Sequence, residues 1–237
     1  MTTPVELMGA PGSPYTRKML AAMRYRHIPY RVEWQNVRGK QDSQHAVGRP
    51  RAKVGLLPTF YLPNAAGEIE AVTDSTPLIR RFEQEFAGRH IVPADPALAF
   101  INSLVEDYAD EWLTKAMFHY RWHYQADIAK AASILPRWGN ISAANEVVQP
   151  FSDMVASRQI DRLSYVGSNA VTKPLIEKSF QRFLEIFDTH LQNTPYLLGQ
   201  RPASADFAIY GQLTCLALFD PTPQAIIVQQ FPRIYAW

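Results

Sequence analysis

The chain has a single cysteine, no long apolar run and almost no net charge, and each shortage excludes a class of protein. Of its 237 residues only Cys215 is a cysteine, so neither an internal disulfide nor a cysteine-based metal cluster can form. The formal net charge of +2 is too small to indicate a nucleic-acid-binding surface. The apolar runs are too short to span a membrane, and the opening Met1-Thr2-Thr3-Pro4 shows no signal-peptide pattern. We therefore expect a cytoplasmic protein with no nucleic-acid or membrane partner.

The chain does have the composition of a folded protein with a large core. Apolar residues make up 47% of it and charged residues 19%, which is typical of globular domains. Strand and helix patterns alternate at first, prolines interrupt them, and helical spacing then continues to the end. These patterns predict an α/β domain over residues 1–87, a linker over 88–96 and an all-helical domain over 97–237.

The patterns also predict individual elements. In the first part, we expect strands at 5–8, 30–34, 57–62 and 68–72, with the last two forming a hairpin, and helices at 15–25 and from Asp74 or Ser75 to 86. In the second part, an aromatic-rich helical face runs over 101–122, and a less ordered stretch follows near Pro136 and Gly139. Further helical patterns cover 147–165, 174–191 and 204–219, and Pro232 begins another helix.

Ser13 stands where a strand gives way to a helix. A serine at this place is a typical N-cap, and Pro14 suits the first helical position because it has no N–H to leave unpaired. The hydroxyl then lies beside free backbone N–H groups at the positive end of the helix dipole, where an anion is stabilised. The residues alone leave two interpretations open, a simple helix cap or a hydroxyl that stabilises a bound thiolate.

Four separate motifs share one family resemblance. They are Ser13-Pro14-Tyr15-Thr16-Arg17-Lys18, Leu57-Pro58-Thr59, Asp74-Ser75, and the segment from Leu198 to Phe207. In this order they resemble the soluble glutathione transferases of the serine type, over residues 5 to 219. One departure is Ala203, which stands where the family usually has a Ser or Thr that caps reciprocally with Asp206.

The resemblance implies a thioredoxin-like first domain and a glutathione site within it. Ser13 would donate a hydrogen bond to the glutathione sulfur, with Tyr15 and Thr16 as backup hydroxyls. Pro58 would be cis and expose the backbone of Leu57 to the peptide. Asp74 would pair with the glutamyl ammonium and Ser75 with its carboxylate, while Lys40 or Lys53 would meet the glycine carboxylate. The alternatives are ordinary ones: helix caps, a buried trans proline and solvated surface charges.

The second substrate is expected between the domains, against Tyr15 and one face of the long helical pattern. Trp112, Lys115 and His119 follow helical spacing on that face, although such residues are also typical of a core. His119 and His123 stand four apart, but no third ligand lies at a supporting spacing, so we predict no metal site.

The function predicted from the sequence is a glutathione S-transferase. Glutathione would be the co-substrate, its thiol would attack a small apolar electrophile, and the protein would be a homodimer as its relatives usually are. Two alternatives remain open. Glutathione could instead serve a dehalogenase, isomerase or peroxidase reaction, or the scaffold could be a non-catalytic binding or assembly module.

Overall fold

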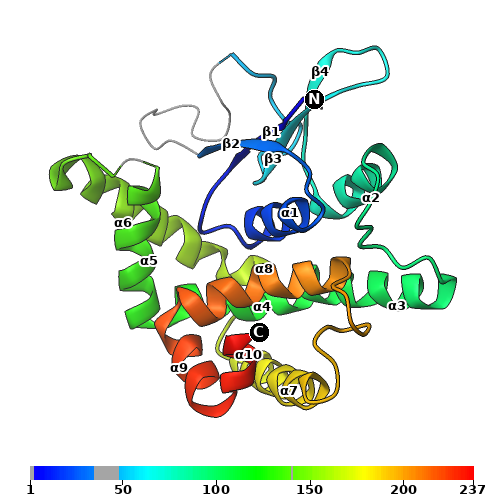
Figure 1. Cartoon of the computed structure of the whole chain (residues 1–237). Coiled ribbons are helices and arrows are strands. Elements are labelled where there is room, and N and C mark those ends of the chain that lie inside the picture. Colours follow the sequence, from blue (N-terminus) through cyan, green and yellow to red (C-terminus); the bar gives the residue numbers. More distant parts are fainter. Residues whose placement is uncertain (1–2, 35–47, 140) are drawn as a thin grey trace.

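The computed structural model describes residues 3–34, 48–139 and 141–237, and it divides them between a sheet domain and a helical domain (Figure 1). The sheet has the order β2-β1-β3-β4, with β1 and β2 parallel and the other pairs antiparallel. Two helices complete this thioredoxin-like unit. Its elements are β1 (Val5–Gly9), α1 (Pro14–Tyr25), β2 (Tyr30–Trp34), β3 (Thr59–Pro63), β4 (Ile69–Val72) and α2 (Ser75–Glu85).

The core of the sheet domain forms because its central strands are apolar on both faces. Leu7 of β1 and Phe60 of β3 are buried with Met19 of α1 and Leu78 of α2 in one cluster. Strands covered on both faces read as continuous apolar runs, and β3 matches this, with only its last residue exposed. The pairing places the end of β1, the start of β3 and the end of β4 side by side, next to the starts of α1 and α2.

The helical domain is built around one buried helix. Its elements are α3 (Pro96–Asp107), a π-helical segment (Tyr108–Leu113), α4 (Thr114–His123), α5 (Gln125–Trp138), α6 (Asn145–Asp161), a 3₁₀ segment (Arg162–Val166), α7 (Lys173–Leu191), α8 (Ser204–Leu218), α9 (Pro221–Gln230) and α10 (Pro232–Ala236). Almost every residue of α8 is buried, as expected of a helix that is apolar all round. Figure 1 shows α8 beneath α1, so the two domains share this contact.

Gly211 of α8 explains how closely the domains approach. A Cβ atom at Gly211 would lie 2.5 Å from the carbonyl oxygen of Pro14 in α1, which no side chain can tolerate. At the other end of α8, Ala203 offers no side-chain acceptor, and Asp206 accepts hydrogen bonds from the N–H groups of Ala203 and Leu197, each at 2.9 Å. Half of the usual reciprocal cap is thus missing without loss of the helix start.

One expectation about the helices was wrong, and one helix was not predicted. The chain near Pro136 is not less ordered, because Pro136 lies in the last turn of α5 and the helix ends only after Trp138. Pro136 removes one i→i−4 hydrogen bond there, and the helix continues for only two more residues. The sequence also gave no clear sign of α9, which begins with Pro221 at its first position. In the described residues we find no helix with the length and apolar character needed to cross a bilayer.

Candidate functional site

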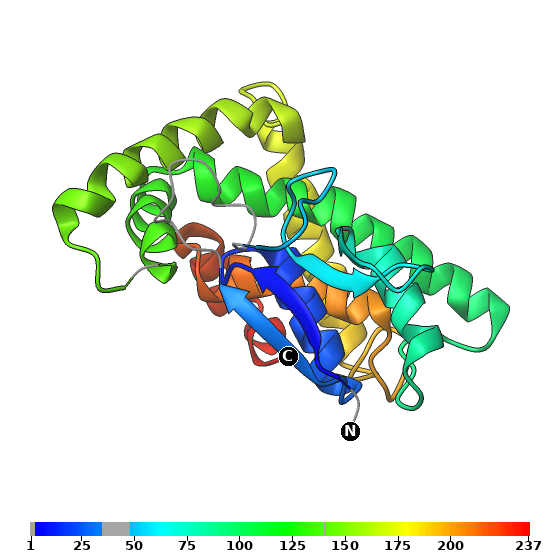
Figure 2. The same cartoon turned by 90° about the horizontal axis from the view of Figure 1, so that it is seen from above.

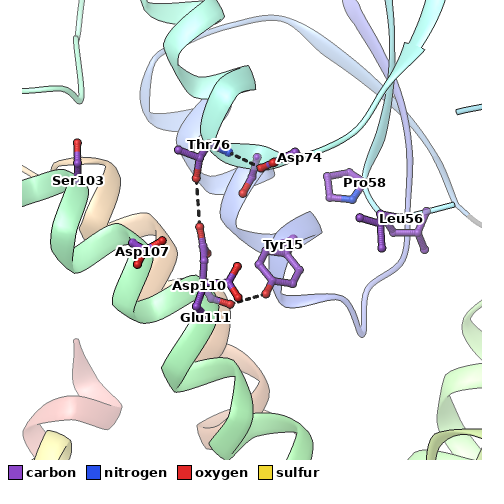
Figure 3. A pocket seen from close by; sticks show the side chains of 11 residues that line it. Tyr15, Leu56, Pro58, Asp74, Thr76, Ser103, Asp107, Asp110 and Glu111 are labelled. Carbon is purple, nitrogen blue, oxygen red and sulfur yellow. Dashed lines mark hydrogen bonds between the residues drawn. The ribbon is translucent and has the colours of Figure 1, made fainter. Parts of the chain in front are cut away.

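A cavity of about 470 Å³ lies between the sheet domain and the α3 side of the helical domain (Figure 3). The sheet domain contributes one wall and the helical domain the wall opposite. The lining residues are Tyr15, Leu56, Leu57, Pro58, Asp74, Ser75, Thr76, Ser103, Asp107, Asp110 and Glu111. Five of the residues that the sequence singled out, namely Tyr15, Leu57, Pro58, Asp74 and Ser75, therefore meet at one cavity.

One edge of the cavity is the segment that leads into β3. The peptide bond between Leu57 and Pro58 is cis, as the family resemblance implied. The side chain of Thr59 donates a hydrogen bond to the carbonyl oxygen of Leu56 at 2.7 Å, which holds this turn. Leu57 and Pro58 both line the cavity wall.

The N-terminus of α2 forms the next part of the wall. Asp74 caps the helix, because its carboxylate accepts the N–H of Thr76 at 3.2 Å. Its backbone φ of +81° is unusual for a residue other than glycine, and such strain tends to persist where function requires it. Ser75 follows as the first helical residue and is buried. Free N–H groups and a hydroxyl at a helix start suit an anion, while the exposed Asp74 carboxylate suits a cation.

Ser13 caps α1 and lies next to this wall. Its hydroxyl oxygen accepts the N–H of Thr16 at 3.2 Å, and its hydrogen is donated to the carbonyl oxygen of Leu57 at 3.3 Å. The second distance is long for an O–H···O bond, which is usually 2.7–2.8 Å. Ser13 is not itself a lining residue of the cavity, but its hydroxyl reaches the backbone of Leu57, which is. The Ser13 side chain therefore caps α1 and also donates a hydrogen bond toward the edge of the cavity.

Tyr15 reaches the cavity with its hydroxyl already occupied. The hydroxyl donates to the carbonyl oxygen of Asp110 at 2.6 Å, and Figure 3 shows the ring between Pro58 and Asp110. Burial raises the pKa of Tyr15 to about 12, an effect that a hydrogen bond with Thr114 opposes. A phenol with this pKa stays protonated at neutral pH. The other neighbouring hydroxyl, Thr16, is fully buried and accepts the N–H of Ala10.

The helical domain brings a buried charge cluster that sequence reasoning missed. Lys18 of α1 lies 2.9 Å from Glu106 and 2.5 Å from Asp110. The hydroxyl of Thr76 lies 3.3 Å from each of the same two carboxylates. Burial raises the pKa of Asp110, although the charge of Lys18 opposes that shift. No spacing in the sequence links residue 18 to residues 106 and 110, so only the packing of α1 against α3 could reveal this cluster.

The π-helical segment decides what the helical domain shows to the cavity. It presents Asp110 and Glu111, and α3 adds Asp107. Together with Asp74 these carboxylates make an acidic lining, and no lysine, arginine or histidine lines it in the part of the chain that the structure describes. This differs from the aromatic wall that the helical spacing suggested.

Three residues expected at the second-substrate site lie elsewhere. Trp112 is on the outer side of the π-helical segment, where its indole N–H donates to Ser179 at 2.7 Å, and Lys115 lies over the Trp112 ring. His119 is buried between Ser168 and Glu177, at 2.8 and 3.2 Å. Trp112 and His119 do lie on one face, as their spacing predicted, but that face packs against α7 and does not line the cavity. Of the two lysines proposed for the glycine carboxylate, Lys53 is exposed and outside the lining, and Lys40 lies outside the described residues.

The fold and the site together define the class of the protein. It has a thioredoxin-like sheet domain, an all-helical domain, and between them a cavity lined by a cis proline. The model of the glutathione S-transferase N-terminal domain matches residues 7–90, and that of the glutathione S-transferase C-terminal domain matches residues 159–237. The two matches together cover more than half of the chain. The chain therefore belongs to the glutathione S-transferase family.

Solved structures agree with this assignment at the level of the fold. A family member from Rhodospirillum rubrum aligns with a TM-score of 0.61 and 13% identity, over 98% of this chain and 85% of that one. A member from Pseudomonas fluorescens, with two glutathione molecules bound, aligns with a TM-score of 0.60 and 12% identity, over 98% of this chain and 85% of that one. A member from Methylobacterium radiotolerans, in complex with glutathione sulfonate, aligns with a TM-score of 0.56 and 17% identity, over 99% of this chain and 89% of that one. No curated protein sequence matches significantly.

Proposed function

We propose that this protein binds glutathione in the cavity and activates its thiol for attack on a small electrophile. The thiol is a poor nucleophile at neutral pH, whereas the thiolate is a good one. A hydrogen-bond donor aimed at the sulfur favours the thiolate and lowers the thiol pKa. The released proton goes to solvent, the sulfur forms a bond to an electrophilic carbon, and the leaving group departs with the bonding pair.

The observation that carries the proposal is the arrangement of three elements around Leu57. Leu57, which is joined to Pro58 by a cis peptide bond, lines the cavity. The hydroxyl of Ser13 lies 3.3 Å from the Leu57 carbonyl oxygen, and Asp74 and Ser75 line the same cavity. An extended peptide lying along Leu57 would place one end at the start of α2 and a side chain near Ser13. Glutathione has this form, and two of the three structures reported above hold glutathione or its sulfonate.

The contacts assigned to glutathione follow from charge. The glutamyl ammonium pairs with Asp74, and its carboxylate accepts hydrogen bonds from Ser75 and the free N–H groups at the start of α2. Ser13 transfers its hydrogen bond from the Leu57 carbonyl oxygen to the sulfur. Leu56, Leu57 and Pro58 give the sheet side of the cavity apolar surface, against which the apolar part of a small electrophile packs.

The test is a titration of reduced glutathione into the protein near neutral pH, followed by the ultraviolet absorbance of the thiolate. A Ser13→Ala variant is measured beside it, and Ser164→Ala, at an exposed serine of the 3₁₀ segment, serves as a control outside the cavity. We expect a saturable thiolate band that the Ser13→Ala variant loses while it still binds glutathione. A band that survives in the variant assigns the activation to another group. Absence of binding overturns the proposal and leaves the non-catalytic binding module as the alternative. Binding of glutathione with turnover of halides or peroxides would instead assign the protein a dehalogenase or peroxidase reaction.

The proposal includes a homodimer in a reducing, cytoplasmic setting. The only cysteine is buried and free, which is compatible with a compartment that keeps glutathione reduced. Leu98, Ile101 and Leu104 recur every third residue along α3 and are all exposed, so they form an apolar stripe that a second copy would cover. Sedimentation of the wild-type protein and of Ile101→Glu tests the dimer, since a charge on this stripe should dissociate it.

A further inference from the structure

The turn that carries Ser13 has a partner for each of its carbonyl groups. The carbonyl oxygen of Ala10 accepts the N–H of Ser13 at 3.0 Å, and that of Pro11 accepts Arg17 Nε at 2.6 Å. The third carbonyl, that of Gly12, belongs to the peptide bond that leads directly into Ser13. Its orientation therefore sets the direction in which the Ser13 side chain leaves the backbone.

Arg121 of α4 holds the Gly12 carbonyl from the other domain. Its Nη1 donates to the Gly12 oxygen at 2.9 Å. The remaining side of the guanidinium is bound to Asp220, with Nε at 2.9 and 3.1 Å from the two carboxylate oxygens and Nη2 at 2.9 Å from one of them. Both side chains are almost completely buried. Because this fork fixes the plane of the guanidinium, Nη1 can point in only one direction.

Side chains of α5 close the turn from a second side. A Cβ atom at Gly12 would lie 2.5 Å from Leu135 and 2.9 Å from Trp138. Figure 2 shows α5 and α6 at one end of the helical domain, opposite the end where α3 begins. Contact with α5 prevents the turn from moving outward, and the guanidinium holds its last carbonyl in place.

We infer that Arg121 is a positioning residue for Ser13, and the inference rests on the proposed function. A buried ion pair is a poor source of stability, because desolvation offsets much of its attraction. Here the pair directs a charge-assisted donor at one backbone carbonyl, next to the serine that would contact sulfur. A shift of Ser13 by a fraction of an ångström changes its distance to a bound thiolate, and misplacement of about 1 Å can cost about a hundredfold.

The experiment measures the pH dependence of the thiolate band of bound glutathione, which reports the apparent pKa of its thiol. The variants are Ser13→Ala, Arg121→Gln, Arg121→Lys and the double variant Ser13→Ala with Arg121→Gln. Arg26→Gln is the matched control. Arg26 is also a buried arginine that pairs with a carboxylate, Glu83, and donates to a backbone carbonyl, but it lies at the opposite end of α1 from Ser13.

We expect Arg121→Gln to lower the thiolate-to-thiol ratio of bound glutathione by about tenfold. Arg121→Lys should give a smaller loss of about threefold, because one ammonium cannot reproduce the fork toward Asp220 and the contact with Gly12 together. Arg26→Gln should destabilise the protein and leave the ratio unchanged. In the Ser13→Ala background, Arg121→Gln should change the ratio by less than about twofold, because residues that act through one another are not additive.

Three outcomes separate the inference from the proposed function. If the wild-type protein gives no thiolate band, the proposed function fails and the inference fails with it. If the band is present and depends on Ser13, but Arg121→Gln has the wild-type ratio, only the inference is overturned. Should Arg121→Gln not fold, as judged by circular dichroism, Arg121→Lys decides, and a wild-type ratio in that variant overturns the inference equally.

Discussion

The hydroxyl of Tyr15 donates to the carbonyl oxygen of Asp110 at 2.6 Å, so a side chain at the start of α1 is tied to the π-helical segment of the other domain. The bond explains why Tyr15 lines the cavity without being free to act there. It also occupies the O–H donor that Tyr15 would need in order to stabilise a thiolate. Tyr15 thus joins the two walls of the cavity.

We predict that Tyr15→Phe lowers the free energy of unfolding by about 1 kcal/mol, the usual net worth of one such hydrogen bond. The thiolate band of bound glutathione should change less than in Ser13→Ala. Denaturant unfolding and the glutathione titration measure the two effects. Tyr210→Phe is the control, since Tyr210 is on α8 and partly exposed. Loss of the thiolate band in Tyr15→Phe, with Ser13 intact, would contradict the assignment of activation to Ser13.

The same residue gives a pH dependence. Its pKa is about 12 in the folded protein and about 10 in an unfolded chain. Because the folded value is the higher one, the contribution to stability is fully present below pH 10 and is lost as the pH rises toward 12. Unfolding of the wild-type protein should therefore become easier above about pH 10, and Tyr15→Phe should show less of this loss. If the free energy of unfolding falls equally with alkaline pH in the wild-type protein and in Tyr15→Phe, the assignment of this loss to Tyr15 is wrong.

Lys18 stands between two buried carboxylates, and removing it should be costly. Lys18→Met leaves Asp110 buried without a cation and leaves Glu106 with Arg80 alone, and we expect a loss of about 3–5 kcal/mol in the free energy of unfolding. Asp110→Asn should cost less, about 1 kcal/mol, because an amide oxygen still accepts from Lys18 and the site no longer buries that charge. Guanidinium unfolding compares the two variants. Equal losses of unfolding free energy in the two variants would show that the stability of the cluster does not depend on the balance of its charges.

Asp74 should show a conflict between stability and binding. Asp74→Gly relieves the strain of a φ of +81° and gives up one helix cap, so we expect unfolding stability to stay constant or to rise by about 1 kcal/mol. Removal of the carboxylate should weaken glutathione binding by about tenfold or more, the value of one charged hydrogen bond. Calorimetric titration and thermal unfolding measure both. Unchanged affinity would show that Asp74 is only a cap.

His119 should make the protein sensitive to mild acid. Burial lowers its pKa, and His123 and Lys173 add to this, while Glu177 opposes it. The unfolded chain then binds the proton more readily, so stability is present above about pH 6.5 and falls as the pH drops below that value. His119→Gln should flatten this part of the curve, measured by denaturant unfolding between about pH 7.5 and 5. The control is His27→Asn, because His27 is exposed and has a positive φ that asparagine tolerates. A slope that survives in His119→Gln would assign the effect to another group.

The sequence predicted most of the first domain because local signals there are strong. The Ser13-Pro14 helix start, the alternating strand at Tyr30 and the hairpin turn were each specified by neighbouring residues. The cis bond before Pro58 came from the family resemblance, since the local pattern equally suits a trans proline. The assignment of catalytic and binding roles to Ser13, Leu57 and Asp74 remains a prediction.

The sequence by itself determined where strands, caps and turns begin, because those depend on residues a few positions apart. It did not determine which face of a long helix meets the cavity, since helical spacing is the same for a core face and a lining face. Only tertiary structure turned Trp112 and His119 toward α7, brought Asp110 to the cavity, and placed Lys18 and Arg121 against carboxylates about a hundred residues away. Such contacts form only when the helices pack together, because packing couples residues that the sequence keeps apart.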